Sequence, residues 1–204
     1  MKPSEQPKAV DHKMTKQNIL ESIGQFSPFD LELFENHTTQ NCFNKNDVFL
    51  KEGEVCKSLY FIQSGSFFQF QLKDIDEVII DLHLEGEWMF NHQSLSEQTP
   101  SKTTIKAFSK SEVIELSLES FHALASKSTS FLQFHKILNQ AHNRTYIFDN
   151  SLTPIERYDY IKRAKPQLVK IFPIKMIASY LKIAPETLSR VRANTIKFHD
   201  LNQV

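Results

Sequence analysis

The chain has 204 residues, of which 40% are hydrophobic and 24% charged, and its 24 Lys and Arg balance its 24 Asp and Glu. This composition excludes a wholly disordered chain, and no apolar run reaches the roughly 20 residues that a membrane span requires. The two cysteines, Cys42 and Cys56, are too few for a disulfide framework or a four-cysteine cluster, so each is expected to be a buried, inert thiol.

The N-terminal segment is polar and carries no structural signal. Residues 1–16 lack the apolar stretch of a secretory signal, so we expect a cytoplasmic protein with no membrane partner. Residues 1–14 are predicted to form a flexible N-terminus. A short helix is predicted over residues 17–23, ending near Gly24.

Short apolar runs separated by turn signals then follow at roughly ten-residue spacing. Phe68, Phe70 and Leu72 alternate with Gln69 and Gln71, which is the period-2 pattern of a half-buried strand. No helical signal separates the runs between about residues 41 and 118, so they are predicted to form an antiparallel sandwich or barrel within a domain of residues 15–127. The runs lie at residues 47–50, 59–62, 68–72, 78–82, 105–108 and 113–116.

The pattern becomes helical over residues 128–150. Six positions follow one another at spacings of 3, 4, 3, 4 and 3, close to the period of a coiled-coil seam. The segment is therefore predicted to be a dimerisation helix, and the alternative is a helix that lies against the barrel of its own chain. The six positions are Phe131, Phe134, Leu138, Ala141, Thr145 and Phe148.

The balanced net charge conceals two halves of opposite sign. Residues 1–150 hold 14 Lys and Arg against 20 Asp and Glu, a net of −6, whereas residues 151–204 hold 10 against 4, a net of +6. A basic segment after an acidic body suggests a separate module with an anionic partner, nucleic acid being the first candidate. The alternative is a solvated basic surface with no partner.

Three helices are predicted in this basic segment, residues 151–204. Thr153 and Glu156 have the spacing of a capping box, with Pro154 at the first helical position, so a helix should start there and stop before Pro166. Two short helices starting near residues 173 and 185, with a turn between them, have the spacing of a helix-turn-helix. Their apolar positions are Ile177, Leu181, Ile183, Leu188 and Val191, with the small Ala178 at the crossing.

The exposed face of the last helix then carries polar residues suited to reading bases. Arg can donate two hydrogen bonds to guanine, and Glu can accept one from cytosine, each such contact discriminating by about 1–3 kcal/mol. These residues are Glu186, Thr187, Ser189, Arg190 and Arg192.

The runs 177–181 and 185–190 resemble the DNA-binding end of the Crp/Fnr family of transcription regulators. The resemblance implies an α+β fold: an antiparallel β-roll of the cyclic-nucleotide-binding, jelly-roll type, a long dimerisation helix, and a winged-helix-like helix-turn-helix domain. It also implies base contacts from Glu186, Ser189 and Arg190 and a phosphate contact from Thr187. Lys182 stands where the family's turn often has Gly, so it must either tolerate an unusual backbone angle or shift the turn.

The implied partners follow from the same resemblance. They are double-stranded DNA with a pseudo-palindromic site, a second copy of the chain, and RNA polymerase. Lys175, Arg192 and Lys197 are expected to neutralise phosphates, which makes affinity fall with salt.

The sensing site is where the sequence departs from the family pattern. The family's Arg-Ser position falls at Ser101–Lys102 and its Gly-Glu position near Phe90–Asn91, and residues 1–143 contain no arginine. Lys102 offers only a point charge to a phosphate. Binding of a cyclic nucleotide is therefore not expected, and no cofactor is assigned.

Other candidate ligand residues have ordinary alternatives. Phe70, Trp88 and Phe90, with Lys102, could line an effector pocket, or the aromatic residues could belong to the core. His83 and His92 lie where a haem ligand would be, but a surface or hydrogen-bonded role is expected for both.

The sequence is compatible with three classes of function. A dimeric, sequence-specific DNA-binding regulator fits best, and it is distinguished by salt-dependent retention on DNA from a small-molecule-binding module that signals through a protein partner. A metal-dependent enzyme of the β-barrel type would need a histidine cluster with a nearby Glu, and His83 and Glu85 are the nearest approach. The chain is therefore not expected to be an enzyme.

Overall fold

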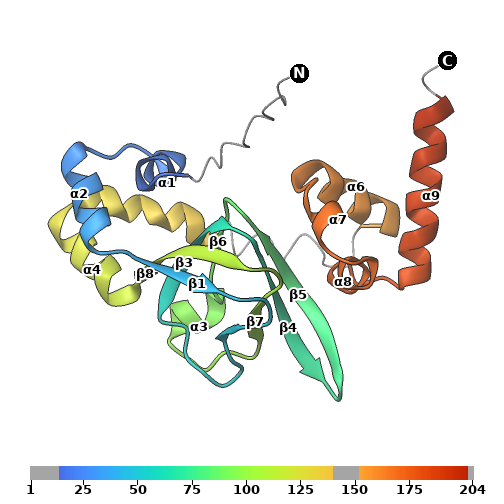
Figure 1. The fold of residues 1–204 in the computed structure, drawn as a ribbon, viewed down its shortest axis with the longest axis horizontal. Coiled ribbons are helices and arrows are strands. Elements are labelled where there is room, and N and C mark those ends of the chain that lie inside the picture. The colour runs from blue at the N-terminus through green and yellow to red at the C-terminus, as the bar shows by residue number, and fades with distance from the viewer. Residues whose placement is uncertain (1–13, 140–151, 202–204) are drawn as a thin grey trace, which may run out of the picture.

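The computed structural model describes residues 14–139 and 152–201, with side chains up to residue 193, and shows an α+β fold (Figure 1). Before the gap, the elements are α1 (Lys16–Ile23), α2 (Pro28–Asn36), β1 (Thr39–Phe43), β2 (Val48–Leu50), β3 (Ser58–Ser64), β4 (Ser66–Lys73), β5 (Asp76–Leu84), β6 (Trp88–Met89), α3 (His92–Glu97), β7 (Thr104–Ala107), β8 (Ser111–Ser117), α4 (Leu118–Lys127) and the 3-10 helix η1 (Thr129–Phe134). After the gap come α6 (Pro154–Ala164), α7 (Leu168–Ile171), α8 (Ile174–Tyr180) and α9 (Pro185–Leu201).

The strands form two antiparallel sheets of four strands each, as the sequence pattern predicts. One sheet has the order β1-β8-β3-β6 and the other β2-β7-β4-β5. Strands β4 and β5 form a long hairpin at the edge of the second sheet, and Figure 1 shows it extending from the roll toward the C-terminal helices. The two sheets enclose the interior of the β-roll.

Local capping signals account for the N-terminal helices. Thr15 and Asn18 form a capping box at the start of α1, and Gly24 ends the helix, which agrees with the predicted helix over residues 17–23. Helix α2 begins with a second capping box, in which Ser27 and Asp30 bond each other's backbone N–H groups. Helices α2, α3 and α4 were not predicted, although α2 begins with local signals, the capping box of Ser27 and Asp30 with Pro28 at the first helical position.

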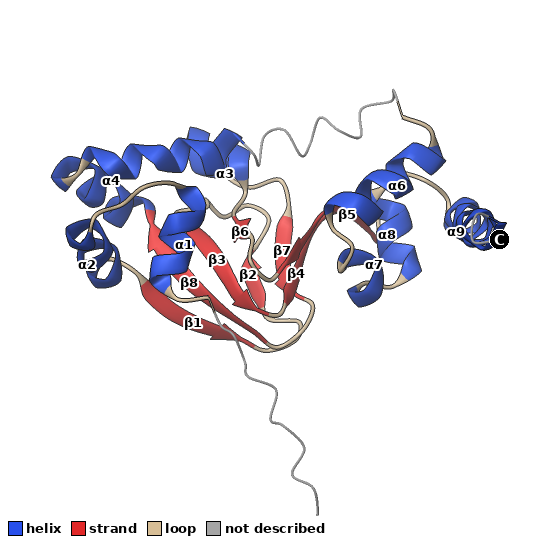
Figure 2. Cartoon of the chain, turned by 90° about the horizontal axis from the view of Figure 1, so that it is seen from above, coloured by secondary structure: helices blue, strands red, loops and turns tan. Residues whose placement is uncertain are grey.

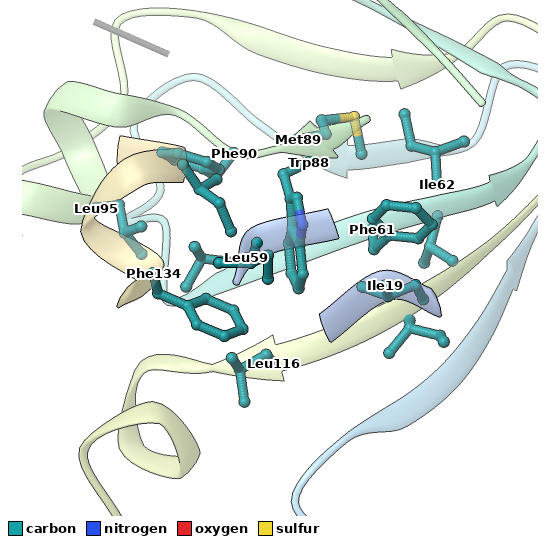
Figure 3. Close-up of a cluster of buried hydrophobic side chains, with 14 of the residues drawn as sticks. Ile19, Leu59, Phe61, Ile62, Trp88, Met89, Phe90, Leu95, Leu116 and Phe134 are labelled. Atoms are coloured by element: carbon teal, nitrogen blue, oxygen red, sulfur yellow. The ribbon is translucent and has the colours of Figure 1, made fainter. Parts of the chain in front are cut away.

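A first hydrophobic core fills the roll and continues under the N-terminal helices and η1. Trp88 stands between Phe61 and Phe134, with ring centroids 5.5 Å and 5.4 Å away (Figure 3). Phe131 and Phe134 are both fully buried in this core, 0% and 1% exposed. This corrects their assignment to a dimer seam, because a side chain already enclosed by its own chain has no surface left for a partner helix.

The two cysteines differ in environment. Cys56 is buried, and burial raises the pKa of its thiol, as expected for an inert side chain. Cys42 is exposed, which corrects the expectation that both are buried. It lies on β1, which pairs with β8 alone among the described strands, so β1 is an edge of the sheet as described.

A second hydrophobic core joins the β4–β5 hairpin to the C-terminal helices. Successive residues of β4 point to opposite faces, so Phe67 belongs to the first core while Phe68 and Phe70 belong to the second. Figure 2 shows the hairpin as the part of the sheet nearest to α7 and α8.

Candidate functional site

Helix α6 opens the C-terminal group of helices with a complete capping box. The Thr153 side chain accepts from the Glu156 N–H, and the Glu156 carboxylate accepts from the Thr153 N–H at 2.7 Å. The helix ends at Ala164, before Pro166, which agrees with its predicted start and stop. Its Arg157 is buried and donates to the carbonyl oxygens of Leu152 and Leu181, both at 2.9 Å.

Arg157 links helix α6 to the C-terminal end of helix α8. The Leu181 carbonyl closes the C-terminus of α8, where unpaired carbonyls create a partial negative charge that a guanidinium stabilises. The sequence analysis missed Arg157, because nothing in the local pattern shows that α8 ends beside α6.

Helices α8 and α9 are joined by a tight turn with one left-handed residue. Lys182 has φ +56°, as the sequence analysis expected for a lysine at this position. The Lys182 N–H donates to the Ser179 carbonyl, and the Ile183 N–H to the Ala178 carbonyl, both at 3.0 Å. These bonds satisfy the last carbonyls of α8 and turn the chain sharply into α9.

The two helices cross through small and branched apolar side chains. Ala178 and Leu188 are 0% exposed, and Ile177, Leu181 and Val191 are buried around them. The absence of a long side chain at Ala178 lets the helix backbones approach closely. As far as its side chains are described, the opposite side of α9 is exposed to solvent at residues 186, 189, 190 and 193.

That free side carries the residues predicted to read bases. Glu186, Ser189 and Arg190 are all exposed, and positions i, i+3 and i+4 share one helix face. The Arg190 side chain donates to the Glu186 carbonyl at 3.4 Å, so its Nε lies along the helix near Glu186. Helix α9 is the element farthest from the roll in both views (Figures 1 and 2).

The residues predicted to contact phosphates differ in solvent exposure. Lys175, near the start of α8, is exposed, and Thr187 and Arg192 are half-buried beside the reading face. The side chain of Lys197 lies outside the described residues. The structure thus places three basic or hydroxyl side chains around Glu186, Ser189 and Arg190 on the same pair of helices.

A second group of polar residues lies inside the roll. The Asn91 amide donates to Ser101 Oγ at 3.0 Å and to Thr103 Oγ1 at 2.8 Å, and the Gln69 amide donates to Thr103 Oγ1 at 2.7 Å. All four residues are buried, and Asn91 Oδ1 also accepts from the Ser94 N–H. The two positions that the family pattern assigns to ligand contacts, Asn91 and Ser101, are therefore bonded to each other.

The residues predicted to line an effector pocket do not converge. Phe70 belongs to the second core, on the face of β4 that points toward the helices, whereas Trp88 and Phe90 belong to the first core. Lys102 is exposed. The three aromatic residues are core residues, as the alternative interpretation proposed.

The two histidines considered as haem ligands, His83 and His92, lie in different surroundings. His83 is 3% exposed and lies opposite Phe67 in the β4–β5 pairing, so it faces the interior of the roll, where its Nδ1 is 3.9 Å from an Asp81 carboxylate oxygen. His92 begins α3 beside the ring of Phe90. Among the described residues, no group of three or more His, Cys, Asp or Glu side chains could hold a metal ion.

The remaining positions of the predicted seam lie at or beyond the first gap. Leu138 is half-buried against the first core, and Ala141, Thr145 and Phe148 lie outside the described residues. None of the described helices is both long enough and apolar enough to cross a membrane.

Comparison with known proteins places the fold. Residues 40–128 match the family model of the cyclic nucleotide-binding domain. No curated protein matches the sequence. Among the solved structures that share the fold are three at 16% or 17% identity.

FixK2 from Bradyrhizobium japonicum is 16% identical, with a TM-score of 0.61 over 79% of this chain and 86% of its own. The Thermus thermophilus Catabolite Activator Protein is 17% identical, with a TM-score of 0.55 over 89% of this chain and 88% of its own. The sensor domain of the transcriptional regulator DNR from Pseudomonas aeruginosa is 16% identical, with a TM-score of 0.51 over 67% of this chain and 91% of its own.

Proposed function

We propose that this chain, whose residues 40–128 match a cyclic nucleotide-binding domain, is a sequence-specific DNA-binding transcription regulator of the Crp/Fnr type. Helices α8 and α9 would be its helix-turn-helix, with α9 in the major groove. The observation that carries the proposal is the exposed face of Glu186, Ser189 and Arg190, supported from behind by the buried Leu188 and Val191. Two proteins of the same fold are named as an activator protein and a transcriptional regulator.

In this proposal, each polar residue on α8 and α9 makes a specific contact with DNA. Arg190 would donate to a guanine, Glu186 would accept from a cytosine, and Ser189 would contact either. Thr187, Lys175, Arg192 and Lys197 would bind phosphates and hold the helix in register, without reading sequence. The +6 net charge of residues 151–204 favours such a polyanionic partner.

A homodimer is part of the proposal. Two copies would present their α9 helices to successive major grooves about 34 Å apart on a pseudo-palindromic operator. With Phe131 and Phe134 buried in the core, the proposed seam consists of Leu138, Ala141, Thr145 and Phe148. RNA polymerase as a further partner and a cytoplasmic location complete the proposal.

The roll is proposed to work without a cyclic nucleotide, sensing another effector or none. The buried hydrogen bond between Asn91 and Ser101 joins the two positions where a sugar and a cyclic phosphate would bind. No arginine in residues 1–143 can offer the bidentate contact that a phosphate favours.

The first test is a selection of random duplex DNA on the purified protein at near-physiological salt. We expect an enriched motif with two-fold symmetry. The variant Arg190→Ala should lose about 1–3 kcal/mol of base discrimination and retain weak, salt-sensitive binding. The matched control is Arg163→Ala, an exposed arginine of α6 away from the reading face, which should keep the motif.

Two outcomes contradict the proposal. If Arg190→Ala weakens binding to the motif and to unrelated DNA equally, Arg190 does not read bases. If no DNA is retained at any salt concentration, the chain is better explained as a small-molecule-binding module with a protein partner.

A further inference from the structure

The outer face of the β4–β5 hairpin is apolar and is covered by the C-terminal helices. It presents Phe68 and Phe70 from β4, and Ile79, Leu82 and Leu84 from β5, all 7% exposed or less. The side chains packed against them come mostly from α6 to α9, with Phe108 beside Phe172 at a ring-centroid distance of 4.8 Å. Without these helices, the hairpin would expose a continuous apolar patch to solvent.

Hydrogen bonds and an ion pair at the same interface fix the position of the helices on the hairpin. The Ile79 N–H of β5 donates to Ser179 Oγ of α8 at 2.9 Å. Lys165 Nζ, just after α6, donates to the Leu82 carbonyl at 3.2 Å and lies 2.9 Å from a Glu87 carboxylate oxygen. Lys165 and Glu87 are each 16% exposed, so their ion pair is largely shielded from water.

These two kinds of contact have different consequences. Apolar burial stabilises the contact but is not directional, so it alone permits sliding or rotation of the helices on the hairpin. The hydrogen bond at Ser179 and the ion pair at Lys165 lie on two different segments, α8 and the end of α6. Because the helices also rest on the apolar face, they cannot slide or rotate on the hairpin without breaking one of these two directional contacts.

The contact leaves the reading face open. Glu186, Ser189 and Arg190 are exposed, and α9 lies on the side of the helices away from the roll (Figures 1 and 2). The hairpin holds α8 by Ser179, whereas Lys175, on the same helix, remains exposed. The observed contact is thus compatible with an α9 that is free to enter a groove.

We propose that the β4–β5 hairpin is a docking platform that sets the orientation of α8 and α9 relative to the roll, and that operator affinity depends on this contact. The proposal of operator affinity rests on the DNA-binding function proposed above, whereas the docking itself does not. In a dimer, two reading helices match two half-sites only if each is held at a defined angle to its own roll. Loosening the platform therefore raises the entropic cost of binding both half-sites together.

The test combines a distance measurement with DNA binding in the full chain. Fluorophores are placed at Glu32→Cys on α2 and Ala193→Cys on α9, both exposed, in a Cys42→Ser background that removes the exposed native thiol. Labelled chain is mixed with an excess of unlabelled chain, so that a dimer carries one labelled copy. DNA binding is measured on the same variants without the two added cysteines and their labels, because residue 193 shares a helix face with Arg190. The double variant Ser179→Ala, Lys165→Met removes both directional contacts and leaves the apolar face intact. The matched control is Ser126→Ala, Lys162→Met, which alters two exposed residues outside the interface.

We expect a single narrow distance distribution in the parent and control, and a broadened one in the double variant. Operator affinity should fall about tenfold in the double variant, with unrelated DNA bound as before. Circular dichroism confirms that each variant is folded.

Two results overturn the proposal: an unchanged distance distribution, or a broadened one with unchanged or tighter operator binding. If the parent protein selects no DNA motif, the proposed function fails, and the distance distribution still decides whether the hairpin docks the helices.

Discussion

Replacing Lys182 with glycine should stabilise the protein, although a lysine is removed from a basic module. Lys182 sits in the turn between α8 and α9 at φ +56°, a left-handed conformation that costs a residue with a Cβ about 1–2 kcal/mol. The Lys182 N–H keeps its bond to the Ser179 carbonyl in the variant, because that bond is made by the backbone. Glycine loses more entropy on folding, which offsets roughly 0.5–1 kcal/mol of the gain.

The balance predicts a net stabilisation of about 0.5–1 kcal/mol for Lys182→Gly. For a chain of this length, that corresponds to a rise in the thermal midpoint of roughly 1–4 °C. The comparison is Lys162→Gly, the same change at an exposed position inside α6, which should destabilise by about 1 kcal/mol because glycine is a poor helix former. Urea unfolding of both variants measures the two free energies. If both variants are destabilised equally, the argument from backbone strain at Lys182 is wrong.

Three other predictions test the core, the N-terminal helices and the roll. Phe134→Ala should lower the free energy of unfolding by about 3–5 kcal/mol, whereas Leu132→Ala, whose side chain is 57% exposed, should change it by less than about 1 kcal/mol; similar losses in urea unfolding would mean that Phe134 is not a core residue. Burial raises the pKa of Asp30, but hydrogen bonds from Ser128, Ser27 and Ser130 outweigh it and leave the pKa below its usual 3.8. The ionised carboxylate therefore stabilises the fold above about pH 4 and loses this contribution as pH falls through the lowered pKa, so the stability gap between the parent and Asp30→Asn in urea unfolding should narrow below about pH 4; a gap that widens there would contradict the assignment. Cyclic AMP at about 1 mM should leave the thermal midpoint unchanged, since only a ligand that binds the folded state raises it; a clear rise in a thermal shift assay would refute the proposed occupation of the site by Asn91 and Ser101.

Signals carried by a few neighbouring residues were predicted well from the sequence. The capping box of Thr153 and Glu156 and the turn at Lys182 depend on contacts within one helical turn, and the structure confirms both. The strands were recognised by alternation, which is also local. Helix α2 was missed even though its capping box of Ser27 and Asp30 is an equally local signal.

Contacts between distant segments were not predictable in the same way. The alternation in β4 identified a strand but not its faces: Phe68 and Phe70 point to the C-terminal helices, and Gln69 points into the roll. In β5, an irregularity opposite Gln69 and Phe70 brings Ile79 onto the same face as Leu82, a spacing that simple alternation cannot produce. The periodicity of Phe131 and Phe134 was equally compatible with a partner helix and with the chain's own core.

One face of β4 packs in the first core and the other in the second core, and this limits where residues can be inserted or deleted in the chain. Inserting or deleting one residue between Ser66 and Phe70 would exchange its two faces, turning Gln69 toward the apolar helices and Phe68 into the interior of the roll. The roll and the reading helices would lose their packing in the same step. Length changes in the hairpin are therefore tolerable chiefly at its tip, where Ile75 is 93% exposed and lies beyond the last paired residues, Lys73 and Asp76. Among homologous chains, insertions in this hairpin should cluster at the tip, while the strand beneath it keeps its length.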